Sequence, residues 1–126
     1  MTHQAKVLVV DDDENILAAF AEFLKGENCE MVPASSAEEA EEILRQRRID
    51  VLVTDIRLKL KSGVTLFMEV KQEEHTLPVI VVSGYPDQIS EAEVKILGAD
   101  YYFVKPLELN QLREALRSCL SKERRP

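Results

Sequence analysis

Five short runs of apolar, mostly β-branched residues alternate along this chain with longer segments in which apolar residues recur at helical spacing. The runs are predicted to be strands at residues 5–10, 29–33, 50–54, 78–82 and 100–104. Strands that alternate with helices in this way are typical of a parallel sheet with helices on both faces. The first, third and fourth runs are continuously apolar, as expected for strands covered on both sides. The sequence therefore predicts an α/β fold with a doubly wound, five-stranded parallel sheet.

The segments between the predicted strands carry apolar stripes that indicate amphipathic helices. The stripe after the first strand contains Ile16, Leu17, Phe20, Phe23 and Leu24, and the stripe after the last strand contains Leu109, Leu112, Leu116 and Leu120. We expect both stripes to face the core. Ser36 and Glu39 stand three residues apart and predict a capping box at the start of the second helix. That helix continues through the apolar positions Ala40, Ile43 and Leu44.

Two glycines and an aspartate predict further helix boundaries. A third helix follows Gly63, and three of its residues are expected to face inward: Val64, Phe67 and Met68. Gly98 is predicted to end a fourth helix that spans about residues 86–97. Asp13 is interpreted either as the cap of the first helix or as a solvated residue.

Length and composition predict one small domain. At 126 residues the chain is long enough for one core and too short for two ordinary domains. We expect the domain at residues 1–121 and a polar tail, or the start of a linker, at 122–126. No apolar run reaches the roughly 18 residues of a membrane span, and Cys29 and Cys119 lack metal-ligand spacing. The sequence therefore predicts a soluble, cytoplasmic protein with two buried or half-buried thiols, and its net charge of −7 argues against nucleic acid binding by this domain.

Acidic residues follow two of the predicted strands at the points where those strands end. Asp11, Asp12 and Asp13 come directly after the first strand, and Asp55 follows Thr54 at the end of the third. Ligands of such sheets bind outside the carboxyl ends of the strands, so these carboxylates are expected to converge. Like charges repel, and hard oxygen ligands with room for water are what Mg²⁺ prefers. The pattern predicts a magnesium site suited to phosphoryl chemistry.

Two more polar side chains follow the fourth and fifth predicted strands. Ser83 stands before Gly84, and Lys105 stands before Pro106. A hydroxyl and an ammonium group are thereby expected at the same edge as the carboxylates. A nucleophile, a metal, a hydroxyl donor and a cation are the parts of a phosphoryl-transfer site.

Taken together, these motifs resemble the receiver domain of response regulators in bacterial two-component signalling, over essentially the whole chain. That family carries an acidic pair after strand one, an acceptor aspartate after strand three, a serine or threonine after strand four and a Lys-Pro after strand five. The matching residues, in the right order and spacing, are Asp11, Asp12, Asp55, Ser83, Lys105 and Pro106. The resemblance implies a flavodoxin-like sheet in the order 2-1-3-4-5, with strands one and three at the switch point of the winding.

Other positions match the family or depart from it. Tyr102 occupies an aromatic position three residues before the lysine, and Gly63 occupies a glycine position eight residues after the acceptor. Tyr101 is expected on the opposite face of its strand. Lys59 stands where a proline is usual, and Arg57 stands two residues after the acceptor. Both departures are expected to alter loop rigidity and the lifetime of a phosphorylated form.

The resemblance implies a role for each site residue. Asp55 attacks phosphorus in line and keeps the phosphoryl group as an acyl phosphate, so the chain is a phospho-acceptor that catalyses its own phosphorylation and dephosphorylation. Mg²⁺ is held by Asp11 or Asp12, by Asp55 and by the backbone carbonyl of Arg57. Lys105 pairs with Asp55 at rest and with a phosphate oxygen afterwards.

The resemblance also implies a switch. Ser83 is expected to move toward the phosphoryl group and Tyr102 to turn inward behind it, which changes the surface of helix four, strand five and helix five. The implied partners are a sensor histidine kinase or a phosphotransfer protein, and a second copy of the chain at that surface. The bond between Lys105 and Pro106 is a candidate cis peptide.

The lifetime of the phosphorylated form has two interpretations. Arg57 and Tyr85 stand two residues after Asp55 and Ser83, where large side chains can shield the phosphoryl group from water, and shielding predicts slow self-dephosphorylation. Alternatively, Arg57 pairs with a surface carboxylate and the rate is ordinary.

Three other functions share parts of this pattern. A haloacid-dehalogenase-like phosphatase also phosphorylates an aspartate, but it needs a second aspartate where Arg57 stands. A flavodoxin-like flavin binder needs small hydroxyl residues after strand one, where acidic residues here would repel a phosphate. A receiver-like scaffold with an unused site is the remaining alternative. The sequence leaves open whether the chain is free-standing or the amino-terminal module of an enhancer-binding transcription activator or a hybrid sensor kinase.

Overall fold

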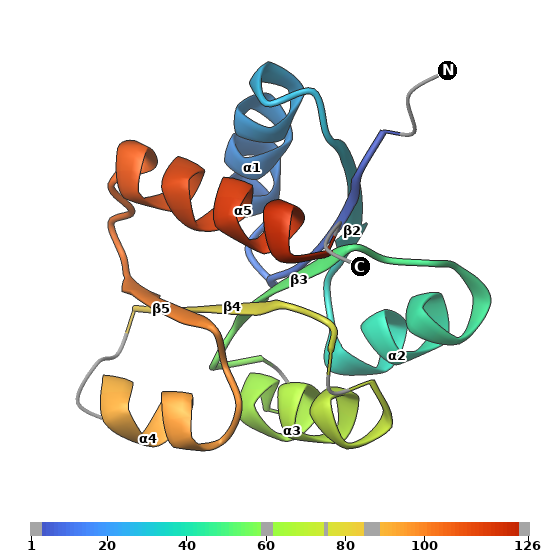
Figure 1. The fold of residues 1–126 in the computed structure, drawn as a ribbon, viewed down its shortest axis with the longest axis vertical. Coiled ribbons are helices and arrows are strands. Elements are labelled where there is room, and N and C mark those ends of the chain that lie inside the picture. Colours follow the sequence, from blue (N-terminus) through green and yellow to red (C-terminus); the bar gives the residue numbers. More distant parts are fainter. Residues whose placement is uncertain (1–3, 59–61, 75, 85–88, 124–126) are drawn as a thin grey trace.

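All strands of the sheet run in the same direction, and helices cover both of its faces (Figure 1). The computed structural model describes residues 4–58, 62–74, 76–84 and 89–123. The strands are β1 (Lys6–Val10), β2 (Glu30–Ala34), β3 (Val51–Asp55), β4 (Val79–Ser83) and β5 (Tyr101–Val104). Their order in the sheet is β2-β1-β3-β4-β5, which confirms the predicted doubly wound fold.

Each strand begins one residue later than predicted, and the residues that precede two of the strands are aspartates. Asp50 and Asp100 precede β3 and β5, and their carboxylates take the place of backbone acceptors at the amino edge of the sheet. Asp50 Oδ2 accepts a hydrogen bond of 2.8 Å from the Lys6 N–H, and Asp100 Oδ2 accepts one of 2.9 Å from the Val79 N–H. These side chains satisfy the first donors of neighbouring strands, so the buried backbone at this edge is paired.

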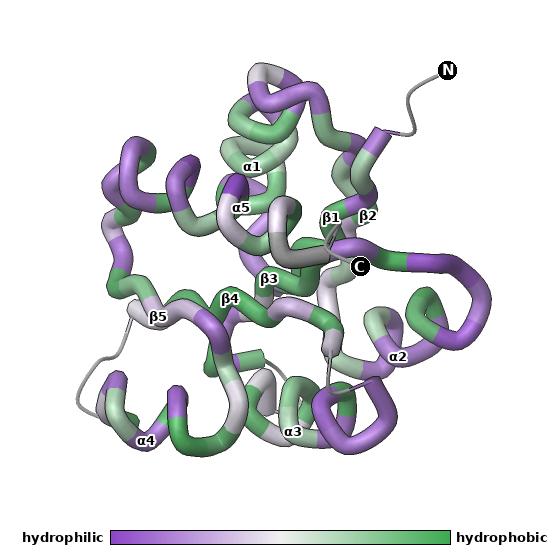
Figure 2. Tube along the Cα trace, viewed as in Figure 1, coloured by the Kyte–Doolittle hydropathy of each residue, from purple (hydrophilic) through white to green (hydrophobic). Residues whose placement is uncertain are grey.

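Two layers of helices enclose the sheet. Helices α1 (Glu14–Gly26) and α5 (Leu109–Glu123) cover one face, and α2 (Ala37–Gln46), α3 (Gly63–Glu73) and α4 (Glu91–Ile96) cover the other (Figure 1). Hydrophobic residues concentrate in the central strands and hydrophilic ones in the outer turns of the helices (Figure 2). Helix α5 extends two residues into the segment predicted as a polar tail. Within the described residues, no helix is both long and apolar enough to cross a membrane.

Alternating strand residues supply two separate cores. Leu8 and Val10 of β1 pack on the side of α2, α3 and α4, whereas Val7 and Val9 pack on the side of α1 and α5. The same alternation puts Tyr102 on the first side and Tyr101 on the second, as predicted. The two cysteines, Cys29 and Cys119, are both buried in the α1 and α5 core, which also confirms the prediction.

Two residues assigned to the core are exposed. Met68 was predicted to face inward, but it is 37% exposed because Leu66, Phe67 and Val70 fill the inner side of α3. Leu109 was assigned to the inner stripe of α5, but it is the first residue of that helix and is 52% exposed. A helical stripe predicts which face is buried only where another element covers that face.

The predicted capping box at Ser36 is only half formed. The Ser36 hydroxyl accepts the Glu39 N–H at 3.1 Å, but the Glu39 carboxylate accepts the N–H of Ser35 instead of that of Ser36. A complete capping box joins Ser90 and Glu93 at the start of α4. The predicted helix at 86–97 is therefore wrong at its start, because α4 begins after Ser90; residues 86–88 lie outside the described part of the chain.

The end of α4 agrees with the prediction. Gly98 follows the C-cap residue Leu97 and has a φ of 120°. This backbone conformation is rare for residues with a side chain, so glycine is the residue that allows the turn into β5.

A buried carboxylate joins the two helices on one face. Glu27 caps α1, and its side chain is only 8% exposed. Arg113 Nε lies 2.8 Å from Glu27 Oε2, and Arg117 Nε lies 3.1 Å from Oε1. The Arg113 guanidinium also lies over the ring of Phe23, with its carbon 5.9 Å from the ring centroid. These contacts tie α5 to the carboxyl end of α1.

Replacement of Glu27 by glutamine should lower the free energy of unfolding by about 1 kcal/mol near pH 7, because charge-assisted pairs that are partly open to solvent contribute about that much. The hydrogen bond from Arg113, assisted by Arg117, holds the pKa of Glu27 below its ordinary value in the folded protein. The contribution is therefore complete above the unfolded pKa of about 4.3 and is lost as the pH falls through the lowered folded pKa.

Denaturant titrations of both proteins at a series of pH values test this expectation, and the two stabilities should converge in acid. Glu22→Gln changes an exposed glutamate of the same helix and serves as the matched control. A stability difference for Glu27→Gln that stayed constant down to about pH 2 would contradict the expectation, because the Glu27 carboxyl of the wild-type protein should then be protonated and its ion pairs lost.

Candidate functional site

Four strands bring polar side chains to one edge of the sheet. Asp11 directly follows β1, Asp55 and Ser83 are the last residues of β3 and β4, and Lys105 directly follows β5. The strands are parallel and paired up to these ends, so residues that are distant in the sequence meet at the carboxyl edge. This is the edge at which ligands bind in open α/β sheets.

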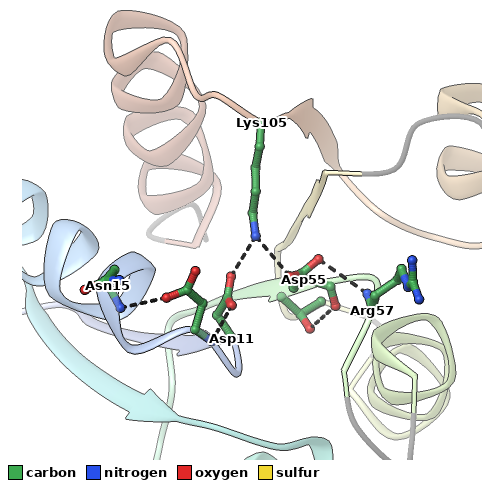
Figure 3. A network of polar contacts seen from close by, with 7 residues as sticks. Asp11, Asn15, Asp55, Arg57 and Lys105 are labelled. Atoms are coloured by element: carbon green, nitrogen blue, oxygen red, sulfur yellow. Dashed lines mark hydrogen bonds and ion pairs between the residues drawn. The ribbon is translucent and has the colours of Figure 1, made fainter.

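The Lys105 side chain forms two ion pairs at the centre of the site (Figure 3). Its Nζ lies 3.0 Å from Asp11 Oδ2 and 3.0 Å from Asp55 Oδ2. Burial acts to lower the pKa of Lys105, but the hydrogen bonds to Asp11 and Asp55, assisted by their charges, outweigh burial and raise it. The ammonium group is therefore charged and held between the two carboxylates.

The Asp11 carboxylate is nearly enclosed and only partly compensated. Asp11 is 3% exposed, and its Oδ1 accepts a hydrogen bond of 2.9 Å from the Asp13 N–H. Burial raises the pKa of the Asp11 carboxyl despite this bond and the nearby Lys105. An additional cation beside Asp11 would favour its charged form.

Three carboxylates lie close enough to share one metal ion. Asp11, Asp12 and Asp55 each offer one oxygen, and these oxygens all lie within 4.8 Å of one another. Lys105 brings one positive charge to three negative ones, so the group keeps a net negative charge. Hard oxygen donors and excess negative charge fit Mg²⁺, which accepts a few carboxylates and keeps several waters.

Asp13 belongs to the helix and not to this group. Its carboxylate accepts the Asn15 N–H at 2.9 Å and caps α1, which confirms the capping interpretation. A capping aspartate satisfies a backbone donor that the first turn leaves unpaired.

Backbone groups that follow β3 contact both the Asp55 carboxylate and the adjoining main chain. Its Oδ1 accepts the Arg57 N–H at 3.3 Å, and the Gly63 N–H donates to the Ile56 carbonyl at 2.8 Å. The Arg57 side chain is exposed, and in Figure 3 its guanidinium extends away from Asp55. A side chain is not tolerated at Gly63, because a Cβ there would lie 1.7 Å from the Asp55 carbonyl oxygen.

Ser83 and Tyr102 lie on neighbouring strands below the site. Ser83 is fully buried, and its carbonyl accepts the Lys105 N–H at 2.8 Å. The Tyr102 hydroxyl is shielded from solvent, makes no hydrogen bond to the described part of the protein, and belongs to a ring packed toward α2, α3 and α4. The peptide bond between Lys105 and Pro106 is cis, as the sequence suggested.

Two predicted residues lie outside the described part of the chain, and one residue at the site was not predicted. Tyr85 and Lys59 fall in the residues that are not described. The unpredicted residue is Thr54, a fully buried hydroxyl next to Asp55. Its signal in the sequence is a polar residue at an inward position of an otherwise apolar strand.

The comparisons with known proteins agree with this geometry. Residues 7–117 match the family described as response regulator receiver domain. The chain is 30% identical over 122 residues to transcriptional regulatory protein ZraR of Escherichia coli O157:H7, a match that covers 96% of this chain and 28% of ZraR. It is 33% identical over 101 residues to regulatory protein VanR of Enterococcus faecium, covering 80% of this chain and 43% of VanR. The chain thus spans less than half of either regulator.

A solved structure shows the same fold over nearly all of both chains. The crystal structure of a response regulator receiver protein from Pseudomonas putida is 32% identical, with a TM-score of 0.86, and the match covers 94% of this chain and 99% of that one. This chain belongs to the response regulator receiver family of two-component systems. Five parallel strands in the order β2-β1-β3-β4-β5, with helices on both faces, are therefore the receiver architecture.

Replacement of Gly63 by alanine should lower the free energy of unfolding by about 2 kcal/mol or more, because a Cβ cannot fit against backbone without moving it. Gly26→Ala is the matched control, since nothing lies within 4 Å of a Cβ at that position. Alanine at Gly26 should be neutral or stabilising by up to about 1 kcal/mol. Denaturant titration compares the two variants, and equal stabilities would show that the Gly63 contact is relieved without cost.

Proposed function

We propose that this chain accepts a phosphoryl group on Asp55, with Mg²⁺, and thereby switches the surface formed by α4, β5 and α5. The observation that supports this most directly is the group at the carboxyl edge: three carboxylates within 4.8 Å of one another and Lys105 at 3.0 Å from two of them. A lysine that only stabilises the fold can do so with one carboxylate partner. Here Lys105 is combined with a nucleophile and a set of metal ligands, which together make a phosphoryl-transfer site.

Asp55 is the nucleophile in this proposal. The donor is a sensor histidine kinase or a phosphotransfer protein. A carboxylate oxygen of Asp55 forms a bond to phosphorus, and the bond from phosphorus to the donor's imidazole nitrogen breaks, with its electron pair leaving on the nitrogen. Mg²⁺ held by Asp11, Asp12, Asp55 and the Arg57 carbonyl supplies charge neutralisation at the phosphoryl oxygens. The Arg57 N–H, at 3.3 Å from Asp55 Oδ1, orients the attacking carboxylate.

Lys105 and Ser83 contact the phosphoryl group after its transfer to Asp55. Lys105 is already beside Asp55 and exchanges its carboxylate partners for a phosphoryl oxygen. Ser83 supplies a hydroxyl from the neighbouring strand, and its carbonyl is bonded to the Lys105 N–H. Movement at Ser83 is therefore transmitted directly to the end of β5.

The proposed output surface carries apolar side chains that are exposed to solvent. Ile96 of α4, Val104 of β5 and Leu109 of α5 are exposed by 83%, 41% and 52%. Tyr102 of β5 packs on the α4 side of the sheet and keeps a hydroxyl without a partner in the described structure, so a second position of its ring is favourable if it brings a hydrogen bond. This surface contacts a second copy or an output module of a longer regulator, and sedimentation before and after phosphorylation distinguishes the free and associated states.

Phosphorylation by acetyl phosphate should add one phosphoryl group to the wild-type protein and none to Asp55→Asn, and the uptake should require Mg²⁺. Asp13→Asn is the matched control, because asparagine caps a helix as well as aspartate does and Asp13 is outside the carboxylate group. Intact-protein mass spectrometry measures the result. Equal uptake by Asp55→Asn would contradict the assignment of Asp55 as the phosphorylated residue and favour a receiver-like scaffold.

Millimolar Mg²⁺ should raise the melting temperature, because the ion binds the folded site alone; a concentration 10 to 100 times the dissociation constant stabilises by about 1.4 to 2.7 kcal/mol. Asp12→Ala removes one ligand and should reduce the shift while leaving the fold intact. Thermal melts with Mg²⁺ and with an inert salt at equal ionic strength separate binding from screening. Identical shifts in the two salts would count against a metal site.

Arg57→Ala should speed the loss of phosphate if the guanidinium covers the phosphoryl group. The exposed side chain points away from Asp55 in Figure 3, so covering requires it to rotate once a phosphoryl oxygen is available as a partner. Arg57→Lys keeps the charge without the planar group and separates the two contributions. Loss of phosphate is followed by mass spectrometry, and an unchanged rate in both variants would favour the ordinary-rate interpretation.

A further inference from the structure

Few polar side chains are buried in the described structure, and all but one of them have a role. Asp50 closes the amino edge of the sheet by accepting the Lys6 N–H. Asp11, Asp55 and Ser83 lie at the carboxyl edge and belong to the proposed phosphoryl site. The remaining residue is Thr54, which is 0% exposed.

Thr54 occupies a position where valine would be expected. It lies opposite Val10 of β1 and opposite Val81 of β4 in the sheet register. Both neighbours are buried in the core beneath α2, α3 and α4. Valine has nearly the shape of threonine and would fill the same space without burying a hydroxyl, so packing does not explain the residue.

The Thr54 hydroxyl has a specific partner. It donates a hydrogen bond of 3.0 Å to the carbonyl oxygen of Asp55. A Cβ added to Gly63 would lie 1.7 Å from that same oxygen and 3.0 Å from Thr54 Oγ1, so the Gly63 backbone is packed against both atoms. The hydroxyl thus holds the Asp55 carbonyl at the close contact between β3 and the start of α3.

The contacts of Ile56 and Arg57 depend on the orientation of the Asp55 carbonyl. The Ile56 carbonyl accepts the Gly63 N–H at 2.8 Å, and the Arg57 N–H donates to Asp55 Oδ1 at 3.3 Å. Rotation of the peptide plane between Asp55 and Ile56 would move both contacts. It would also move the Arg57 carbonyl, which the proposed function assigns to the metal ion.

We propose that Thr54 is a positioning residue for the metal and phosphoryl site: its hydroxyl fixes the Asp55 carbonyl, and thereby the direction of the Asp55 carboxylate and the placing of the Arg57 carbonyl. The proposal deepens the proposed function and rests on it for the identity of the ion. Thr54 itself touches neither metal nor phosphoryl group and acts through the backbone of residues 55–57. Outer partners of metal ligands commonly have this role.

The test compares Thr54→Val, which removes the hydroxyl and keeps the shape, with Thr54→Ser, which keeps the hydroxyl. Nuclear magnetic resonance of the metal-free proteins reports the carbonyl carbon of Asp55 and the amide groups of Arg57 and Gly63. Titration with Mg²⁺ alone then gives its dissociation constant. Thr54→Val should shift these resonances and weaken Mg²⁺ binding about fivefold to tenfold, as expected for one lost hydrogen bond behind a ligand. Thr54→Ser should stay close to the wild-type protein in both measurements.

The thermal melt without Mg²⁺ separates positioning from stability. Thr54→Val should melt close to the wild-type temperature, because the methyl group gained among valines offsets part of the hydrogen bond lost at the Asp55 carbonyl. Equal Mg²⁺ affinity in Thr54→Val and the wild-type protein would overturn the positioning role, and so would an equal defect in both variants, which would assign the effect to packing. Absence of Mg²⁺ binding by the wild-type protein would instead overturn the proposed function, and the metal-free resonances would still decide whether Thr54 holds the backbone.

Discussion

The pairing of Lys105 with Asp11 and Asp55 is the interaction on which the site depends. It joins the ends of β1, β3 and β5, although β4 lies between β3 and β5. Neighbouring strands are about 4.8 Å apart, so a group from β5 has to reach across about 10 Å. The long lysine side chain and the side chain of Asp55 together cover that distance, with Lys105 Nζ 3.0 Å from Asp55 Oδ2. A Cβ on Gly84 would lie 3.7 Å from Lys105 Cδ, so the lysine passes beside a residue that has no side chain.

The meeting of the carboxylates at one place follows from the winding of the sheet. Helix α1 leaves β1 toward one face, and α3 follows β3 on the other face, so the winding of the chain reverses between these two strands (Figure 1). The start of α3 nevertheless lies against β3, because Gly63 allows its backbone to contact the Asp55 carbonyl. The backbone of Asp55 is therefore fixed by its contact with the start of α3.

The helices on the two faces of the sheet differ in how firmly they are attached to the rest of the fold. Glu27 binds two arginines of α5 and joins that helix to α1. Helix α4 has only six residues, buries Val94 and leaves Ile96 exposed. A short helix with little buried area is among the elements of lowest local stability in a fold. This difference is consistent with a change that begins at Ser83 and is expressed at α4 and β5, as the proposed function requires.

Local pattern was enough to predict the strands, the sheet class and the polar residues at the strand ends. Burial on both faces produces a continuous apolar run such as that of β1, and a polar residue stands where the run ends. The prediction was wrong for Met68, for Leu109 and for the start of α4, because a helix face or cap is decided by what packs against it. Those neighbours are not visible in a local window of sequence.

The sequence by itself determined which elements form and which chemical groups stand at their ends, since both are recorded in residue order and periodicity. The convergence at the carboxyl edge and the pairing of Lys105 with Asp55 were also expected, whereas the ion pair of Lys105 with Asp11 was decided only by the tertiary structure. Lys105 is separated by 94 residues from Asp11 and by 50 from Asp55, yet it binds both. The ion pair of Glu27 with Arg113 and the contact of Gly63 with Asp55 also join residues that are distant in the sequence or belong to different elements. Such contacts depend on the packing of whole elements, because only the assembled sheet brings distant backbone segments within hydrogen-bonding distance.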